Sequence, residues 1–160
     1  MIMGRLVDAV IAAGTVFGVQ YAAREISPAD DKATRRWYEH LNKPHFNPRG
    51  PAYAVIWTML DGLLAWSGYR LLRAEKSCAR TTALTLWALC VAGVAGFPFF
   101  VFRKRQLGTG LAICLGLIMM SGASIRTAHK VDCKAAAMQV PFFVWLIFAT
   151  CIHEQIWRRN

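Results

Sequence analysis

A carboxylate lies in the middle of a long apolar stretch of this sequence. Asp61 is the only charged residue between positions 50 and 69. In lipid such a group costs about 2.5–3.5 kcal/mol on insertion scales, so it must face other helices and find a polar partner or water. It would contact a polar ligand, exchange a proton, or bond to a neighbouring helix and fix the packing. Because the apolar stretches contain no Lys or Arg to pair with it, the packing role is favoured.

Six tryptophans are many for a chain of 160 residues. Trp157 precedes Arg158 and has the setting of an anchor at a membrane interface. Trp57 and Trp145 stand inside apolar stretches, where an indole either stacks on a flat hydrophobic ligand or packs against its neighbours. Their spacing alone favours packing.

The other reactive side chains form no recognisable catalytic or metal-binding pattern. The four histidines and five cysteines are scattered, and no pair has the spacing of metal ligands or of a disulfide framework. The sequence has no nucleotide-binding loop, no Ser-His-Asp arrangement and no paired carboxylates. We therefore predict no catalytic residue, no metal and no resident cofactor, and we interpret the chain as a non-enzyme.

Five uncharged or nearly uncharged stretches of 18 to 22 residues must position these side chains. A helix needs roughly 20 residues to cross the hydrocarbon core, and backbone groups in lipid must be paired within their own segment. The chain is also 56% hydrophobic, more than a soluble domain of this size has use for. We predict an all-α integral membrane protein, one domain with a five-transmembrane-helix bundle, whose helices cover about residues 6–23, 51–72, 81–102, 107–126 and 136–157.

The basic residues predict an orientation. The side that carries the C-terminus holds eleven Lys and Arg, and the other side holds eight. This small excess favours a cytosolic C-terminus by the positive-inside rule. The net charge of +10 is interpreted as anchoring to anionic membrane lipid, and we expect no nucleic-acid partner because no such binding motif is present.

Two further features concern packing. Residues 24–50 form the one long connection, and the prolines and aromatic residues of its second half predict an ordered lid, or else an interfacial belt without a ligand role. Ala88, Ala92 and Gly96 recur every four residues in the third predicted helix. Small residues at this spacing allow close helix contact, inside the bundle or between two copies; we assign them to a homodimer interface. Pro98 and Pro141 should kink their helices.

The run WYEHLNKPHFNP, from Trp37 to Pro48, is followed nine residues later by Trp57. It resembles the signature W-Y-x-x-L-x-K-P-x-[FW]-x-P…W of the translocator protein family, also known as tryptophan-rich sensory proteins or peripheral benzodiazepine receptors. RQLG at residues 105–108 and PFFVWLIFAT at residues 141–150 resemble two further motifs of this family. The likeness spans all five predicted helices.

The resemblance implies a five-helix bundle, usually dimeric, whose pocket is closed by the lid 24–50. The ligands of the family are cholesterol, porphyrins and haem, and benzodiazepine-type drugs, and its animal members lie in the mitochondrial outer membrane with a cytosolic C-terminus. Asp61 replaces a usual Tyr, and Phe97 ends a run that in the family contains two tryptophans. The implied lid residues are Trp37, Tyr38, Leu41, Lys43 and Pro44, and the implied ligand-binding residues are Trp57, Asp61, Phe97, Trp145, Phe148 and Ala149.

The predicted function is therefore the binding or transport of a rigid hydrophobic molecule, a porphyrin or a sterol, within a membrane. That membrane is the mitochondrial outer membrane, or a bacterial membrane if the source is prokaryotic. Two alternatives remain: an enzyme-like degradation of porphyrin that uses Trp57 and Trp145, and a membrane scaffold or stress-response factor with a vestigial pocket.

Overall fold

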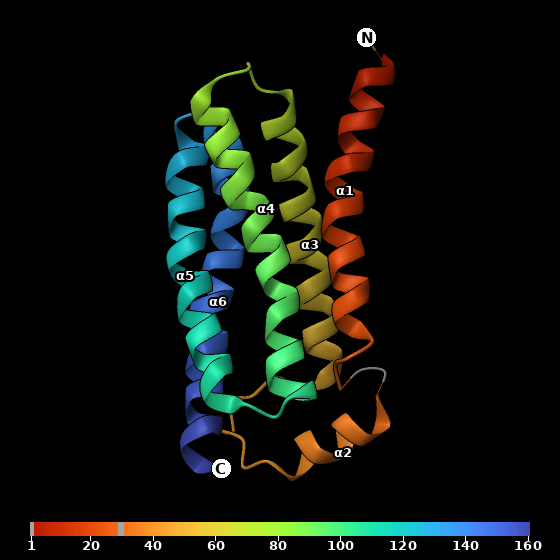
Figure 1. The fold of residues 1–160 in the computed structure, drawn as a ribbon, viewed down its shortest axis with the longest axis vertical. Helices are drawn as coiled ribbons and strands as arrows, with labels where there is room; N and C mark the ends of the chain where they lie inside the picture. The colour runs from red at the N-terminus through yellow and green to blue at the C-terminus, as the bar shows by residue number, and fades with distance from the viewer. Residues whose placement is uncertain (1, 29–30) are drawn as a thin grey trace.

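The computed structural model describes residues 2–28 and 31–160. Five long helices run side by side, and α1 begins at the end of the bundle opposite to the one where α6 finishes (Figure 1). A short helix, α2, lies across the end where α6 finishes, which we call the lid end. The helices are α1 (Ile2–Arg24), α2 (Lys32–His40), α3 (Gly50–Arg73), α4 (Cys78–Pro98), the π-helix η1 (Phe99–Arg103), α5 (Leu107–His129) and α6 (Cys133–Arg159).

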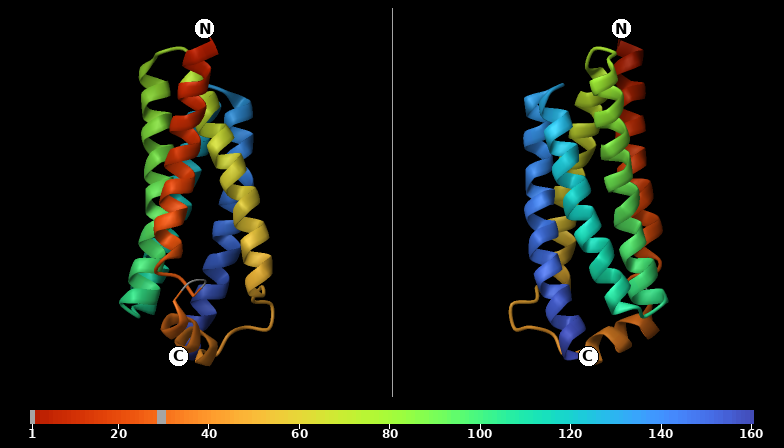
Figure 2. Two further views of the ribbon diagram at one scale, coloured as in Figure 1. Left: turned by 90° about the vertical axis from the view of Figure 1, so that its right-hand side faces the viewer. Right: turned by 60° about the vertical axis from the view of Figure 1, so that its left-hand side comes forward.

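The long helices close into a ring. Helix α1 packs against α3 and α4, α3 packs against α6, and α5 lies between α4 and α6 (Figure 2). Helices α3 and α4 also touch, and α2 contacts η1 at the lid end. This arrangement brings α3 and α6, which carry Trp57 and Trp145, side by side.

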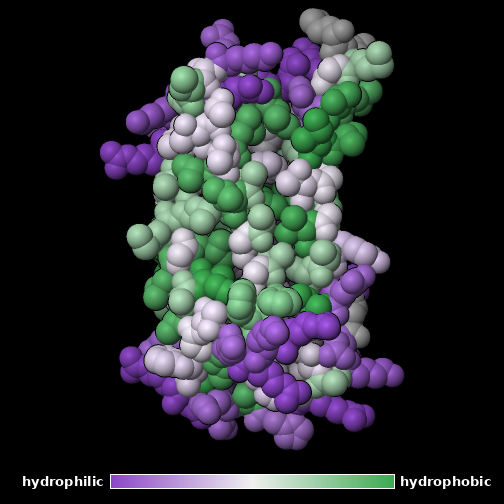
Figure 3. Space-filling view, in the orientation of Figure 1, coloured by the Kyte–Doolittle hydropathy of each residue, from purple (hydrophilic) through white to green (hydrophobic). Residues whose placement is uncertain are grey.

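Four of the helical segments are long and apolar enough to cross a membrane: Met3–Arg24, Cys78–Arg103, Leu107–His129 and Cys133–Arg159. Helix α3 has 24 residues but is not among them. The carboxylate of Asp61 in the middle of α3 lowers the hydropathy of this helix. In the space-filling view, hydrophilic side chains gather at both ends and a mostly hydrophobic band lies between them (Figure 3). The described chain is thus an all-helical membrane protein in which four helices are apolar enough to span a membrane. The other span predicted from the sequence, over residues 51–72, falls on α3, and the count of five spans is not confirmed.

The lid contains a helix, whereas the sequence predicted a loop over 24–50. Helix α2 begins because Asp31 caps it: the carboxylate accepts hydrogen bonds from the backbone N–H of Ala33 at 3.2 Å and of Thr34 at 2.9 Å. The bond from the Thr34 hydroxyl, together with these backbone bonds, lowers the pKa of Asp31. No proline or glycine interrupts residues 32–40. Of the five lid residues that the resemblance implies, Trp37 and Tyr38 therefore lie on α2, and Leu41, Lys43 and Pro44 lie in the connection that follows it.

The two prolines in the helices have different effects. Helix α4 ends at Pro98 and continues as the π-helix η1, where the backbone N–H of Lys104 bonds to the carbonyl of Phe99 at 3.1 Å. Proline lacks the N–H that an α-helix would use, and a wider turn accommodates this loss. Pro141, in contrast, lies inside α6, which runs unbroken to Arg159.

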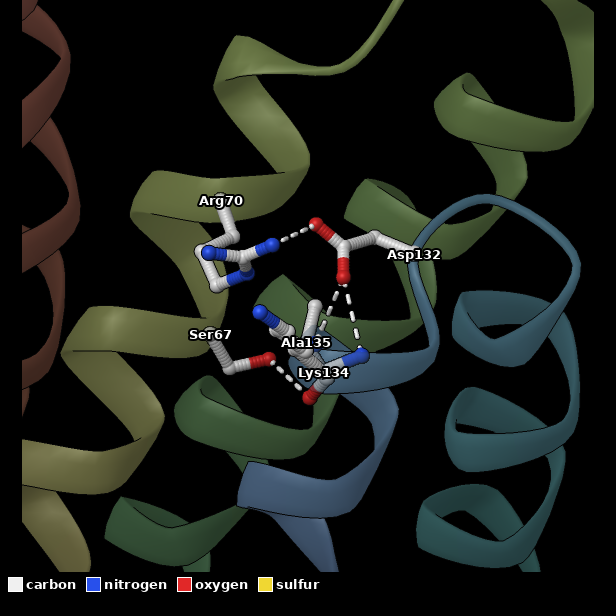
Figure 4. Close-up of polar contacts among 5 residues, drawn as sticks. All are labelled: Ser67, Arg70, Asp132, Lys134 and Ala135. Carbon is white, nitrogen blue, oxygen red and sulfur yellow. Dashed lines mark hydrogen bonds and ion pairs between the residues drawn. The ribbon is translucent and has the colours of Figure 1, made fainter.

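Polar contacts at the end opposite the lid fix α6 against α3 (Figure 4). Arg70 forms an ion pair with Asp132 at 2.7 Å. Asp132 also caps α6 by accepting from the backbone N–H of Lys134 and Ala135. The Ser67 hydroxyl donates to the Ala135 carbonyl at 2.8 Å. These bonds fix the register of α3 against α6, and hence which residues of the two helices meet nearer the lid end.

Helices α3 and α4 approach closely at Gly68. The Trp87 indole donates to the Leu64 carbonyl at 3.0 Å, and a Cβ at Gly68 would lie only 2.3 Å from Cζ2 of that indole. Only glycine fits beside the buried tryptophan at this crossing.

The small residues of α4 lie in different surroundings. Ala88 packs against the core of the bundle, Ala92 is exposed and Gly96 is half-buried. A Cβ at Gly96 would meet no other atom within 4 Å. The part of this row from Ala92 to Gly96 is therefore open to a contact outside the bundle.

Candidate functional site

Six aromatic rings from α3, α6 and the lid meet around Trp145. The Trp145 ring lies 6.4 Å from that of Trp57, 5.6 Å from that of Tyr53 and 5.6 Å from that of Phe148. Phe142 lies 6.4 Å from Trp57, and Phe46 of the lid lies 6.2 Å from Phe148. We call these residues the ring cluster: Phe46, Tyr53, Trp57, Phe142, Trp145 and Phe148.

Helical spacing produces the cluster. Tyr53 and Trp57 are one turn apart on α3, and Phe142, Trp145 and Phe148 recur every three residues on α6. The Trp57 and Trp145 rings meet edge to face, at 82°. Such pairs contribute about 0.5–1.5 kcal/mol beyond the area that they bury.

The lid is bonded to this cluster. The Tyr53 hydroxyl donates to the Asn47 side-chain oxygen at 3.0 Å, and Pro44 is buried. Burial raises the pKa of Tyr38, an effect that hydrogen bonds to Asn47 and Tyr53 partly offset. A lid tyrosine, a lid amide and an α3 tyrosine therefore form one polar group on top of the rings.

Lys43 closes the C-terminal end of α2. Its ammonium donates to the carbonyls of Tyr38 and Glu39 and lies 4.6 Å from the centre of the Tyr38 ring. Burial lowers the pKa of Lys43. The cation thus stabilises helix carbonyls that have no partner within the helix, and it faces the lid itself rather than the rings below.

The lid is also tied to the end of α6. The Asn160 side-chain oxygen accepts from the Asn42 backbone N–H at 2.9 Å, and the Asn160 amide donates to the Asn42 carbonyl at 3.3 Å. The same amide donates to the Ile156 carbonyl at 2.8 Å. We call the two bonds between Asn42 and Asn160 the lid latch.

Phe97 lies in a second group of rings. Its ring is 5.0 Å from that of His153 and 5.9 Å from that of Phe102, which in turn contacts Tyr38 of the lid at 5.6 Å. The His153 ring nitrogen Nε2 donates to the Leu107 carbonyl at 2.8 Å, which joins α6 to the start of α5.

Asp61 faces α1. It is buried, and its carboxylate accepts from the Gln20 side-chain amide at 2.7 Å. The partner that the sequence analysis required is therefore a glutamine of a neighbouring helix.

The structure brings together only some of the residues predicted to bind ligand. Trp57, Trp145 and Phe148 belong to the ring cluster, and the half-buried Ala149 packs beside it. Phe97 contacts His153, one turn beyond Ala149 on the same face of α6. Sequence reasoning missed Phe46, Tyr53, Phe142 and Asn47. Helical spacing could have found two of them: Tyr53, one turn before Trp57, and Phe142, three residues before Trp145.

Two hollows lie away from the ring cluster. A polar hollow of about 430 Å³ is lined by Glu25, Ile26, Asp31, Thr34 and Arg103, between α1, α2 and η1. An apolar groove of about 420 Å³ on α3 is lined by Ala54, Val55, Thr58 and Met59. Neither contains a residue predicted to bind ligand. The cluster rings contact one another, and Phe46 and Phe148 at the edge of the cluster remain 37% and 38% exposed.

The sequence model of the TspO/MBR family matches residues 7–158. The chain belongs to this family. It is 26% identical over 144 residues to the tryptophan-rich protein TspO of Bacillus cereus, an alignment that covers 90% of this chain and 91% of that protein. The tryptophan-rich sensory protein of Cereibacter sphaeroides is 27% identical over 124 residues, which cover 78% and 77% of the two chains. The translocator protein of Bos taurus is 28% identical over 127 residues, 78% of this chain and 75% of that protein.

Membership in the TspO/MBR family confirms the resemblance found in the signature between Trp37 and Pro48. The structure shows where this TspO/MBR signature lies: it runs from α2 through the connection that covers the ring cluster. In this TspO/MBR protein the signature therefore lies at the end of the bundle where α6 finishes, and its Phe46 contacts the ring cluster.

Proposed function

We propose that this protein binds a flat, rigid hydrophobic molecule, a porphyrin or a sterol, at the ring cluster within the membrane, and that it releases or passes on this molecule when the lid opens. The observation that supports this function most directly is the meeting of six rings from α3, α6 and the lid around Trp145. Aromatic rings held on two rigid helices offer apolar surface to a flat ligand, and the lid contacts these rings through Phe46 and Asn47.

Entry of a ligand requires the lid to move. The cluster rings contact one another, so a ligand must replace ring-to-ring contacts with its own. It must also part Phe46 from Phe148 and Asn47 from Tyr53. Ala149 has a small side chain one turn from Trp145, on the face of α6 that leads to His153. A ligand wider than one indole has room to extend along this face.

Titration with protoporphyrin, followed by its absorbance and by quenching of tryptophan fluorescence, tests the proposal. Trp145→Ala removes a ring that contributes on the order of 1 kcal/mol by stacking and also removes its buried area. At about 1.4 kcal/mol per decade, affinity should fall tenfold or more. Trp57→Ala should behave similarly. Trp66→Ala is the matched control, because Trp66 lies on α3 but is 55% exposed.

The outcomes separate the alternatives. Unchanged affinity in both cluster variants, with the helical content preserved, would refute binding at the ring cluster. If protoporphyrin does not bind the unmodified protein and a sterol does not bind either, the scaffold interpretation stands. Light- and oxygen-dependent loss of porphyrin absorbance, abolished by Trp145→Phe while affinity is retained, would show an enzyme-like activity of the indole.

We also propose that α3 spans the membrane with the other four long helices, so that the protein has five spans. Its 24 residues are long enough, and the Gln20 amide satisfies Asp61 inside the bundle. The lid end carries eleven of the 19 Lys and Arg, which supports a cytosolic lid and C-terminus. In an animal cell the mitochondrial outer membrane is the proposed site, and in a bacterium the cell's own membrane. Protection of a tag placed after Asn160 from external protease in intact mitochondria would overturn this orientation.

A further inference from the structure

Basic side chains concentrate on one exposed surface of the lid. Lys32, Arg35 and Arg36 occupy positions i, i+3 and i+4 of α2, so they share a face of that helix. All three are exposed. Asp31 and Glu39 are the only acidic residues between positions 31 and 40, and Asp31 is engaged in capping α2.

A second basic row lies beside the first. Arg103 ends η1, and Lys104 and Arg105 follow it in the turn before α5; all three are exposed. The Arg105 guanidinium lies 5.5 Å from the centre of the Trp37 ring of α2, and η1 contacts α2 through Phe102 and Tyr38. We call the six residues the lid patch: Lys32, Arg35, Arg36, Arg103, Lys104 and Arg105.

The lid patch lies at the border between the polar end and the apolar band. The Lys104 ammonium lies 5.8 Å from the centre of the Phe99 ring, and Phe99 is 40% exposed. Hydrophilic side chains cover the lid end directly below the hydrophobic band (Figure 3). In a membrane this border lies at the depth of the lipid headgroups, where phosphate groups are found.

We propose that the lid patch binds the headgroups of anionic phospholipids in the leaflet that faces the lid. Cations from two adjacent segments form a surface that matches several phosphates at once, and the contact of Lys104 with the exposed Phe99 ring places this surface at headgroup depth. Within this surface, Arg35 Nε also donates to the Pro28 carbonyl at 2.9 Å. Because three of the six belong to α2, a bound lipid bridges the lid and the α4–α5 turn. The composition of that leaflet then influences how firmly the lid is held.

Native mass spectrometry of the full chain in detergent, titrated with phosphatidylglycerol or with phosphatidylcholine, measures this binding. The test variant combines Lys32→Gln and Arg36→Gln, which keep good helix-forming residues in α2. The control combines Arg126→Gln and Lys130→Gln, which remove two exposed charges at the opposite end. At about fivefold per charge, phosphatidylglycerol binding should weaken by more than tenfold in the test variant and should not change in the control.

Several results would overturn the proposal. Equal loss in both variants would show a diffuse effect of surface charge, and equal binding of both lipids would show no preference for anionic headgroups. Displacement of phosphatidylglycerol by the same concentration of inorganic phosphate would show a site for a free anion. Hydrogen exchange in residues 32–40 should slow when phosphatidylglycerol is added. Unchanged exchange would refute the bridge between lipid and lid.

Discussion

The lid latch makes a prediction that separates two asparagines. The latch joins the backbone N–H and carbonyl of Asn42 to the side chain of Asn160. Asn160→Ala therefore removes both bonds. Asn42→Ala keeps both, and loses only a contact of 3.5 Å from its side-chain amide to the Arg159 carbonyl. Of these two residues, only Asn160 should therefore affect the stability of the closed lid when its side chain is removed.

The magnitude follows from the number and setting of the bonds. A protein hydrogen bond contributes about 0.5–1.5 kcal/mol net, and these two lie at exposed residues, so about 0.5–1 kcal/mol each is appropriate. Loss of both destabilises the closed lid by about 1–2 kcal/mol, which is roughly a five- to thirtyfold increase in opening at about 1.4 kcal/mol per decade. If the lid controls release, the dissociation rate of protoporphyrin should rise by a similar factor.

Hydrogen exchange of the Asn42 amide is the direct assay, because this N–H is itself the latch donor. Its exchange should accelerate roughly five- to thirtyfold in Asn160→Ala and change little in Asn42→Ala. The helical content of both variants should equal that of the unmodified protein. Equal acceleration in the two variants, or none in Asn160→Ala, would refute the assignment of the latch.

Three further predictions concern the bundle. Gly96→Leu should convert dimer to monomer in detergent, as measured by light scattering, while protoporphyrin binding persists. A Cβ at Gly96 meets no atom within 4 Å, so the larger side chain should not disturb the bundle itself. An unchanged dimer fraction would exclude this face as the interface. Gly68→Ala should destabilise the fold by about 1–3 kcal/mol because the Trp87 indole cannot move aside, and a thermal midpoint equal to that of the unmodified protein would contradict the close crossing. Burial alone would raise the pKa of Asp132, but bonds from Ala135, Arg70 and Lys134 outweigh it and lower the pKa below its ordinary 3.8. The stability that Asp132 contributes is therefore present above about pH 4 and is lost as the pH falls through the lowered value, so Asp132→Asn should flatten acid unfolding below pH 4.

The long helices could be predicted because lipid imposes a simple rule on the sequence. Each predicted segment, from 6–23 to 136–157, lies within one long helical segment of the structure. The near-absence of charge over about five turns is sufficient for this prediction, since a helix satisfies its own backbone groups in lipid. Whether α3 spans the membrane is harder to predict from the sequence, because Asp61 lowers the hydropathy of α3 while its partner, Gln20, is 41 residues away in the chain.

The helix in the lid and the contacts of the site could not be predicted, because they depend on contacts between residues far apart in the chain, which the spacing of side chains along a helix does not reveal. Helix α2 is short and strongly polar, so neither its length nor its hydropathy resembled the other helices. The family resemblance grouped Phe97 with Trp57, but α4 places Phe97 against His153 at another level of α6. The latch pairs residues that are 118 positions apart, through a backbone group on one side, and no side-chain pattern in the sequence reports such a pair.

The π-helix at the end of α4 has a consequence for insertions and deletions. A π-turn holds one residue more than an α-turn, so the segment after it is rotated by about 100° relative to a regular helix. Phe102 faces Tyr38 and Phe97 because of this extra residue. Removal of a single codon within residues 99–101 would remove the extra residue, restore a regular helix and leave Phe102 on nearly the same face, whereas a change from π-turn to α-turn without a deletion would turn Phe102 away from the lid. At this position a deletion of one residue shortens the turn but keeps the contact between bundle and lid, whereas an insertion or deletion elsewhere in the helix would rotate every side chain that follows by about 100°.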